Sequence, residues 1–308
     1  MGIAVDIYCG FWKNNKKRTQ KKMDKSKERE KKWQNLTLAD DFLFCKIMSD
    51  ISLCSEMIHR IFPELDVSDI RPVETQKAEK LALHIRGVRF DVFTRIARDI
   101  FDIEAQKRRL KDLLKRPRAY HIVMGHDCLN VDTLKKSGSY DNLPNTYVIF
   151  ICIFDPFGKR RHIYSFQNYC TEDKDIALGD GAYTVFLNAK GRLNDISPEL
   201  KRFLDFVGRN KVSEDAFIKI LDEKVREAKE NTEWRSEYMM LLTREDEIGA
   251  EKFAEGVAVG EKRGEKRGEK RGEKRAQRSI YERLVASGKL SPQEASMMTG
   301  WNIKGEKA

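Results

Sequence analysis

Apolar and polar residues alternate along several short stretches of the chain, which is the pattern of β-strands. Between Val88 and Ala105 the alternation has one break, at residues 96–99, and this predicts a β-hairpin. Residues 147–154 form a continuous β-branched and aromatic run, typical of a strand that is covered on both faces. We therefore expect a central strand there, with two further strands at 162–166 and 182–187.

Apolar residues at intervals of three or four predict helices before and after this hairpin. Residues 36–62 are predicted to form one or two helices, with Thr37 and Asp40 as candidate N-caps. Residues 107–114 follow a helical pattern that Pro117 is expected to disturb or end.

The last third of the chain is also predicted to be helical. One helix is expected to start at Ser197-Pro198, and another to follow Ser213 or Asp215. Residues 260–275 repeat Gly-Glu-Lys-Arg four times. Each glycine costs a helix about 0.8–1.0 kcal/mol relative to alanine, and the period of four stacks like charges, so this helix should be marginal. A small helical hairpin is expected over 280–308.

The 308 residues carry a formal net charge of +10, but the charge is unevenly distributed. Lys13–Lys32 contains 11 basic and 3 acidic residues, and Glu251–Ser279 contains 10 basic and 6 acidic residues. The region between these flanks is close to neutral, so it can hold a carboxylate cluster without a uniformly basic surround. The basic leader and the repeat could bind a phosphate backbone without sequence preference. A solvated spacer explains the repeat at least as well, because each Lys-Arg pair comes with a glutamate.

These patterns predict four segments. They are a basic, disordered leader (1–32), an α/β domain (33–240), a charged helical or low-complexity segment (241–279) and the terminal hairpin (280–308). The six cysteines contain no C-x-x-C pair, which indicates neither a zinc site nor a disulfide framework and favours a reducing cytoplasm. No apolar stretch approaches the ~18 residues of a membrane span, and we expect no targeting segment. An alternative start at Met23 is a further hypothesis.

A four-residue connection in the predicted hairpin places Asp91 directly opposite Glu104. The same register gathers an apolar face: Phe90, Val92, Thr94, Phe101, Ile103 and Ala105. It leaves on the other face Arg89, Asp91, Phe93, Asp102, Glu104 and Gln106. Sorting the apolar residues onto one face therefore also brings two carboxylates together.

Two directly opposed carboxylates repel each other unless a cation neutralises them. Their Cβ atoms lie about 4.5–5.5 Å apart in such a pair. Mg²⁺ or Mn²⁺ suits hard carboxylate oxygens, and these ions are held together with waters and a substrate phosphate. The alternative is that Asp91 and Glu104 are solvent-facing charges partnered by Arg89 or Arg95.

Several segments in order carry a family resemblance. They are Leu38-Ala-Asp-Asp41-Phe-Leu-Phe44, Glu104-Ala105-Gln106, Arg116-Pro-Arg118-Ala-Tyr120-His121, Lys136-Ser-Gly138-Ser-Tyr140 and Val148-Ile-Phe-Ile-Cys-Ile-Phe-Asp155. Over roughly residues 36–240 this set resembles the PD-(D/E)XK nucleases, and within them the bacterial recombination-promoting nuclease and putative transposase family. The resemblance implies an α/β fold with an αβββαβ core, in which helices flank a mixed sheet.

The resemblance also implies roles for single residues. Asp91, Glu104 and Gln106 would be catalytic, and Asp91 and Glu104 would bind the metal. Asp41 would complete the metal site, although an N-cap role for Asp40 or Asp41 is an equal alternative. The resemblance implies nucleic-acid contacts from the Arg116-Pro-Arg118-Ala-Tyr120 stretch, through Arg116, Arg118 and Tyr120. For any one of these residues, an exposed basic helix end beside Pro117 is the favoured alternative.

The resulting hypothesis is a Mg²⁺-dependent DNA endonuclease, with Mn²⁺ as a substitute ion, acting in recombination or transposition. Gln106 is neutral and cannot supply the positive charge of the lysine that often stands in this position. The alternative is therefore a catalytically silent nuclease fold used for DNA binding or protein assembly. The helical C-terminal region suggests a homo-oligomer.

Overall fold

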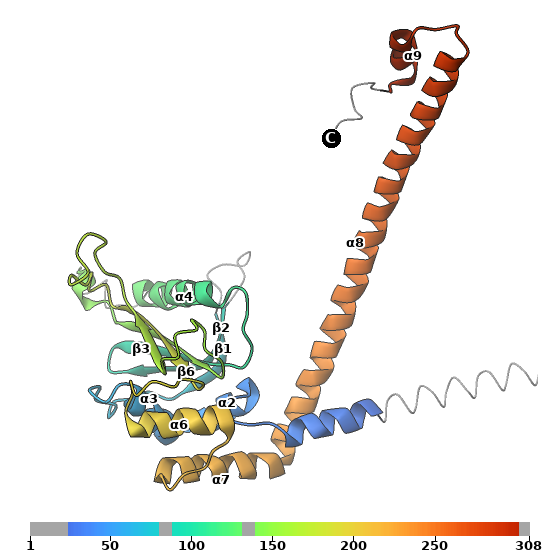
Figure 1. The fold of residues 1–308 in the computed structure, drawn as a ribbon. Helices are drawn as coiled ribbons and strands as arrows, with labels where there is room; N and C mark the ends of the chain where they lie inside the picture. Colours follow the sequence, from blue (N-terminus) through green and yellow to red (C-terminus); the bar gives the residue numbers. More distant parts are fainter. Residues whose placement is uncertain (1–23, 80–87, 131–138, 302–308) are drawn as a thin grey trace, which may run out of the picture. The chain divides into compact units, whose positions relative to one another are not determined.

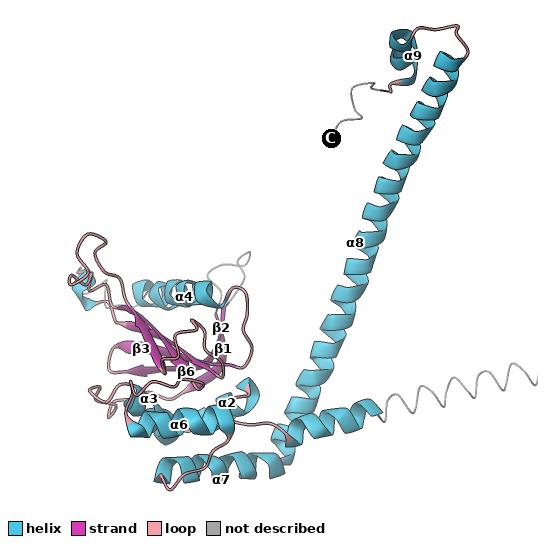
Figure 2. Cartoon of the chain, viewed as in Figure 1, coloured by secondary structure: helices cyan, strands magenta, loops and turns pink. Residues whose placement is uncertain are grey.

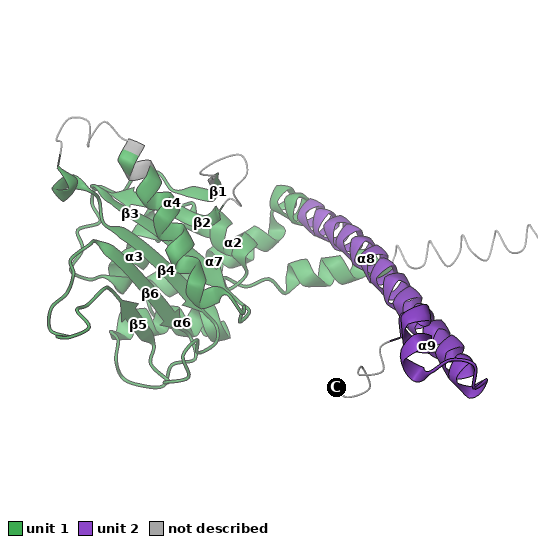
Figure 3. Ribbon diagram, turned by 90° about the horizontal axis from the view of Figure 1, so that it is seen from above, with its two compact units in different colours: residues 1–238 green, residues 239–308 purple. Residues whose placement is uncertain are grey.

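The computed structural model of the chain describes residues 24–79, 88–130 and 139–301. It divides into two compact units, Met1–Tyr238 and Met239–Ala308 (Figure 3). The boundary predicted from the sequence falls after residue 240. Residues 1–23 of the leader, the proposed start at Met23, the positions 136–138 of the family-like motif and the end of the terminal hairpin lie outside the described residues.

Unit 1 is built on a six-stranded mixed sheet, which appears in magenta in Figure 2. The strands are β1 (Glu74–Glu79), β2 (Val88–Ile96), β3 (Asp99–Gln106), β4 (Thr146–Cys152), β5 (Ile163–Phe166) and β6 (Ala182–Asn188). Their spatial order is β1-β2-β3-β4-β6-β5. β3, β4 and β6 run parallel, while β1, β2 and β5 pair antiparallel with their neighbours. The predicted mixed sheet flanked by helices is confirmed.

Helices cover both faces of the sheet (Figure 1). On one face lies α4 (Arg116–Asn130), preceded by the short 3-10 helix η1 (Leu113–Lys115); a second 3-10 helix, η2 (Tyr140–Asn142), precedes β4. The other face is covered by α2 (Asp41–Met48), α3 (Ile51–Ile61), α6 (Pro198–Arg209) and α7 (Ala216–Glu230). The side chains of Ser197 and Asp215 cap α6 and α7, as predicted from their sequence positions.

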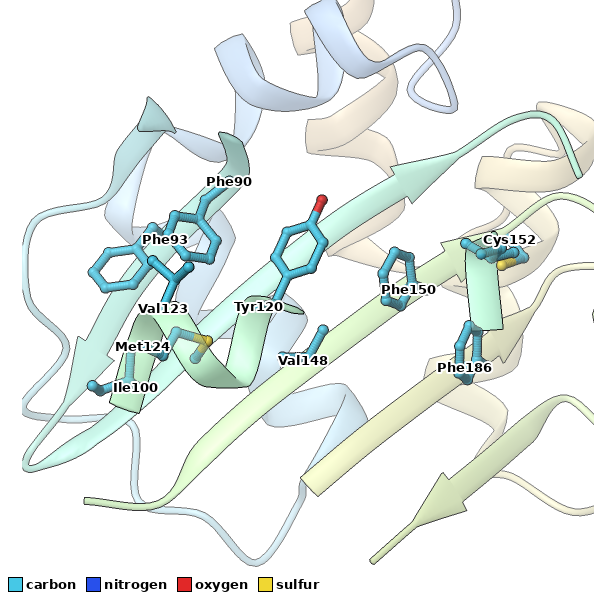
Figure 4. Packing of buried hydrophobic residues seen from close by; sticks show 11 residues of the cluster. Phe90, Phe93, Ile100, Tyr120, Val123, Met124, Val148, Phe150, Cys152 and Phe186 are labelled. Carbon is cyan, nitrogen blue, oxygen red and sulfur yellow. The ribbon is translucent and has the colours of Figure 1, made fainter. Parts of the chain in front are cut away.

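The buried centre of the sheet is β4. Its residues Val148 to Ile151 are at most 1% exposed, which agrees with the prediction of a strand covered on both faces. Under α4 buried aromatic and aliphatic side chains gather in one cluster (Figure 4). Its members include Phe90, Phe93, Tyr120, Val123, Met124, Val148, Phe150 and Phe186. This cluster fixes the height of α4 above β2, β3 and β4.

The predicted register of the β2–β3 hairpin is confirmed. The paired residues run from Val92↔Ile103 to Ile96↔Asp99, and Ala97 in the connection adopts a positive φ of 52°. One face assignment was wrong: Phe90 packs against Phe93 and Tyr120, on the α4 side. The regular ladder ends at Val92, and the pleat alternation is not kept through Asp91, so Phe90 turns to the other face.

One further prediction is wrong, and one strand was missed. Residues 107–112 are not helical, and the helix begins at Arg116 with Pro117 in its first turn instead of ending near Pro117. Proline is well tolerated there because the first-turn N–H groups have no partner within the helix. The polar strand β1, which shows no apolar alternation, was not predicted.

Part of the leader is ordered, although residues 1–32 were predicted to be disordered. Residues 24–34 are helical. Trp33 is fully buried, packs against Phe42 and Tyr238, and donates from Nε1 to the carbonyl oxygen of Lys229 at 3.1 Å. Packing of this one aromatic residue therefore holds a segment whose composition alone is typical of disorder.

A buried ion cluster joins α3 to α6 and α7. Arg60, with a side chain only 7% exposed, donates to both carboxylate oxygens of Asp215, at 2.8 and 3.0 Å. Arg202 donates to the Asp215 Oδ2 atom at 2.9 Å. Asp215 also caps α7 by accepting from the backbone N–H groups of Phe217 and Ile218. The cluster thus locks together the helices beneath the sheet.

Unit 2 contains most of α8 (Thr232–Ala286) and all of α9 (Pro292–Thr299). The Gly-Glu-Lys-Arg repeat lies inside α8, so the predicted marginal helix is continuous with the first helix of the expected hairpin. α9 begins with a capping box formed by Ser291 and Glu294. Among the described residues, no helix is long and apolar enough to cross a membrane.

Candidate active site

Asp91 and Glu104 lie side by side at the end of the β2–β3 ladder. The backbone N–H of Asp91 donates to Glu104 Oε1 at 3.0 Å, one step beyond the last regular pair. Both side chains are buried, with 6% and 3% of their residue surfaces exposed, and both line the same cavity. The hairpin register therefore brings the two predicted carboxylates to one place.

The carboxylate of Glu104 is held on both of its oxygens. Oε1 accepts from the Asp91 N–H, while Oε2 accepts from the Tyr120 hydroxyl at 3.0 Å and from Arg116 Nη2 at 3.4 Å. Arg116 Nη2 also donates to the Tyr120 hydroxyl. With two donors already on Oε2, the open acceptor position of Glu104 is on Oε1, on the Asp91 side.

Arg116 and Tyr120 are therefore internal partners of the site. We predicted both as nucleic-acid contacts, yet Tyr120 is 3% exposed and the guanidinium of Arg116 is directed to Glu104 and Gln106. Arg118 is exposed and does not line the cavity. Two residues beyond Arg116, it lies about 200° around the helix, since each residue turns the helix by about 100°.

Gln106 is turned away from the cavity. Its Nε2 donates to the carbonyl oxygen of Arg108 at 2.6 Å, and its Oε1 accepts from Arg116 Nη1 at 3.1 Å. The side chain is not among the residues that line the cavity. In this arrangement Gln106 supports Arg116, which in turn holds Glu104.

Asp41, the third carboxylate assigned to the metal, stays near the surface. It is the first residue of α2, its side chain is 61% exposed, and its Oδ2 lies 3.8 Å from Arg89 Nη2. Asp40 holds the N-cap position, but its side chain accepts from Thr37 and Lys107 and makes no cap bond. Among the described residues, no three His, Cys, Asp or Glu side chains form a group that could hold a metal ion.

The cavity has a volume of about 500 Å³ and is walled by both the sheet and α4. Its lining residues are Val88, Arg89, Asp91, Glu104, Asp112, Lys115, Arg116, Ala119 and Tyr120. Arg89, Asp112 and Lys115 were not predicted as site residues. Lys115 lies at a helical spacing from positions 116 and 119, and this signal could have found it, whereas Arg89 lies on β2, two residues before Asp91, outside this helical pattern. The ammonium of Lys115 forms no ion pair with any residue in the described ranges.

Burial and mutual repulsion make the carboxyl groups resist ionisation. Burial, followed by the charge of Glu104, raises the pKa of Asp91 to about 8. Burial also raises the pKa of Glu104, although Arg116 opposes this shift. Asp102 is fully buried beside them, and burial together with the charges of Glu104 and Asp91 raises its pKa well above the ordinary range.

Asp102 was placed by the sequence on the same face as Asp91 and Glu104, but without a role. Neither of its carboxyl oxygens receives a hydrogen bond within the described part of the chain, and in its protonated form the group can donate to the neighbouring Glu104 carboxylate. An ionised carboxylate in this position would be strongly destabilising, so the group is held in its neutral form. Asp102 thus adds no negative charge to the pair at neutral pH.

The donor set of Asp91 and Glu104 fits a hard divalent cation. Two neighbouring buried carboxylates repel each other when ionised, and a cation between them would favour their ionised forms and offset the raised pKa values. Mg²⁺ binds through one or two carboxylates and keeps its remaining positions for water and substrate oxygens. The Asp91 side of Glu104 Oε1 is where such an ion would be held.

Replacing Tyr120 by phenylalanine tests the Glu104 anchor. Removing the hydroxyl leaves Oε2 with Arg116 alone, so the affinity for Mn²⁺ should fall about 10-fold or more, as measured by calorimetry. Tyr164→Phe is the matched control, because it removes a similar hydrogen bond, 2.8 Å long, to Asp155 outside the cavity. Equal Mn²⁺ affinities for the two variants would contradict a positioning role for Tyr120.

Both ring nitrogens of His121 contact threonine side chains of the sheet. Its Nδ1 atom lies 2.8 Å from Thr146 Oγ1, and its Nε2 atom lies 3.0 Å from Thr184 Oγ1. Burial lowers the pKa of the ring to about 4, so it is neutral at physiological pH. His121 therefore fixes α4 onto β4 and β6.

Comparisons of this chain with protein-family models, with curated proteins and with solved structures found no match.

Proposed function

We propose that the protein is a cytoplasmic, Mg²⁺-dependent DNA endonuclease with a PD-(D/E)XK-type αβββαβ core, and that Mn²⁺ can substitute for Mg²⁺. The observation that carries the proposal is the meeting of two buried carboxylates, Asp91 and Glu104, on one cavity. A role in recombination or transposition belongs to the same proposal and rests on the sequence resemblance. Placing two buried carboxylates side by side destabilises the fold, and a bound cation would neutralise their charge.

Asp91 and Glu104 would hold the metal. When bound, the ion would supply positive charge for the phosphodiester in its transition state and lower the pKa of an attacking water. Arg116 and Tyr120 orient Glu104 by binding its second oxygen, and Gln106 supports Arg116. Arg89 and Lys115, which are exposed at the cavity, are the cations available to bind the DNA backbone.

A plasmid-cleavage assay with Mg²⁺ tests the function. Asp91→Ala and Glu104→Ala should each reduce the cleavage rate by about 100-fold or more, since metal binding supplies several kcal/mol of transition-state stabilisation. Glu214→Ala, at a carboxylate with 97% side-chain exposure, is the matched control and should cleave normally. Undiminished cleavage by both site variants would refute the assignment.

One observation favours the second candidate, a catalytically silent nuclease fold that binds DNA or assembles proteins. Gln106 faces Arg108 and Arg116 and supplies no positive charge to the cavity. A silent fold would show no Mg²⁺ or Mn²⁺ binding that depends on Asp91. Calorimetry on the unchanged protein and on Asp91→Asn therefore separates the two candidates.

A further inference from the structure

The Gly-Glu-Lys-Arg repeat forms a fully exposed, unpaired cationic surface on α8. Every residue from 244 to 276 is exposed. In the described part of the chain, no basic side chain of the repeat forms an ion pair, although four glutamates belong to the same repeats. The eight basic residues are Lys262, Arg263, Lys266, Arg267, Lys270, Arg271, Lys274 and Arg275.

The period of four places like charges four residues apart: Glu follows Glu, Lys follows Lys and Arg follows Arg at that spacing. The opposite charges that come within reach are Lys and the Glu three residues later, in the less favourable order, and none of these forms an ion pair in the described part of the chain. The Cβ atoms of residues four apart lie about 5–6 Å from each other, so the like charges along each line of the helix repel one another. The helix therefore carries internal repulsion that a bound polyanion would relieve.

The same period separates the charges around the helix axis. Within each repeat, Lys and Arg are about 100° apart, and Glu lies about 150° from the middle of the two. Each further repeat turns this arrangement by about 40° and advances it by about 6 Å. The result is a continuous double ridge of Lys and Arg that winds slowly along the helix. The glutamates form a third line, about 160° from Arg and about 60° from the Lys of the preceding repeat.

This winding argues against a second copy of the chain as the occupant. Two helices pack along their length when the contact positions repeat every 3.5 residues, which keeps one seam facing the partner. A period of four moves the ridge off any such seam. The ridge also contains no apolar side chains, which such a seam requires.

We propose that residues 260–275 of α8 bind the phosphate backbone of nucleic acid without sequence preference. DNA carries one negative charge per about 1.7 Å of its axis, so it offers phosphates to every cation of the ridge, and binding would release condensed counterions. This inference is independent of the carboxylate site. It assigns affinity for DNA to the tail, whereas cleavage is proposed for unit 1.

The test is a binding measurement on the full chain with a short fluorescent DNA duplex in EDTA, which prevents cleavage. One variant replaces four cations of the two central repeats by glutamine, which has nearly the helix propensity of Lys and Arg. These cations are Lys266, Arg267, Lys270 and Arg271. DNA affinity should fall about 10-fold or more, and the slope of log K against log salt should become shallower by about 0.9 for each phosphate that the variant no longer neutralises.

A control separates this effect from a general loss of charge. A triple glutamine variant at Lys219, Lys224 and Arg226 removes cations of α7 that are already paired with carboxylates, and it should bind DNA as the unchanged protein does. Binding is measured in EDTA and cleavage in Mg²⁺, so failure of the nuclease site and failure of the tail are distinguishable.

Three outcomes would overturn the proposal. The first is unchanged affinity and salt slope in the four-fold variant. The second is binding of the repeat to anionic phosphatidylserine vesicles with none to DNA. The third is a change in native mass on substitution with no change in DNA affinity, which would make the repeat an interface between copies of the chain.

Discussion

Without metal at about pH 8.5, Asp91→Asn is expected to unfold at a higher temperature than the unchanged protein. The folded-state pKa of Asp91 is raised to about 8, while an unfolded aspartate ionises near 3.9. Between about pH 4 and pH 8 the folded protein therefore keeps a proton on Asp91 that the unfolded chain has already released. The stability that Asp91 contributes below about pH 4 is lost as the pH rises through about 8. Asparagine stays neutral and avoids this loss.

The expected increase is about 2–4 °C for each kcal/mol relieved, and it should shrink near pH 5. Adding Mn²⁺ should reverse the order, because the ion stabilises the protein that can bind it and leaves Asp91→Asn unchanged. Glu214→Gln, at a carboxylate with 97% side-chain exposure outside the cavity, is the control and should melt close to the unchanged protein without metal. A lower melting temperature for metal-free Asp91→Asn, or an undiminished Mn²⁺ effect on it, would contradict the buried-pair account.

Asp215→Ala is expected to lower the free energy of unfolding by about 3–5 kcal/mol, the usual cost of leaving a buried charge without its partner. The substitution leaves Arg60 buried without its carboxylate and removes the cap of α7. Urea unfolding followed by circular dichroism measures the loss. Glu199→Ala is the control: it removes only a surface partner of Arg202 and should cost no more than about 1 kcal/mol.

The same cluster makes the free energy of unfolding depend on pH in acid. Burial alone would raise the pKa of Asp215, but hydrogen bonds from Arg60 and Arg202 more than offset this and lower it to about 2. Its contribution is present above the unfolded pKa of about 3.9 and is lost as the pH falls through about 2. The stability gap between Asp215→Ala and the unchanged protein should therefore narrow in acid, and a constant gap would contradict the pairing.

The parts of the fold that sequence predicted well are those with a strong local signal. The hairpin register follows from alternation on both sides of one short connection, and the caps at Ser197 and Asp215 follow from residue type and position. β1 was missed because Glu74–Glu79 is polar and pairs with only one neighbour, β2. Its position depends on partners elsewhere in the chain, which local patterns do not encode.

The sequence predicted the two carboxylates of the candidate site well and the residues around them less well. Asp91 and Glu104 meet because the register is local, whereas the direction of Arg116, Arg118 and Tyr120 depends on where α4 begins. Because α4 begins at Arg116, Arg116 and Tyr120 point toward the cavity and Arg118 points away from it. The burial of Asp102 required knowing that α4 closes over this face of the sheet.

The tandem repeat within α8 makes the length of the helix adjustable. One repeat is slightly more than one helical turn, so gaining or losing a copy would move the terminal α9 hairpin by about 6 Å along the helix and rotate it by about 40°. Neither change would interrupt the backbone hydrogen bonds of the helix. The number of repeats therefore determines the length of α8, and an in-frame duplication of twelve nucleotides would lengthen it by one repeat.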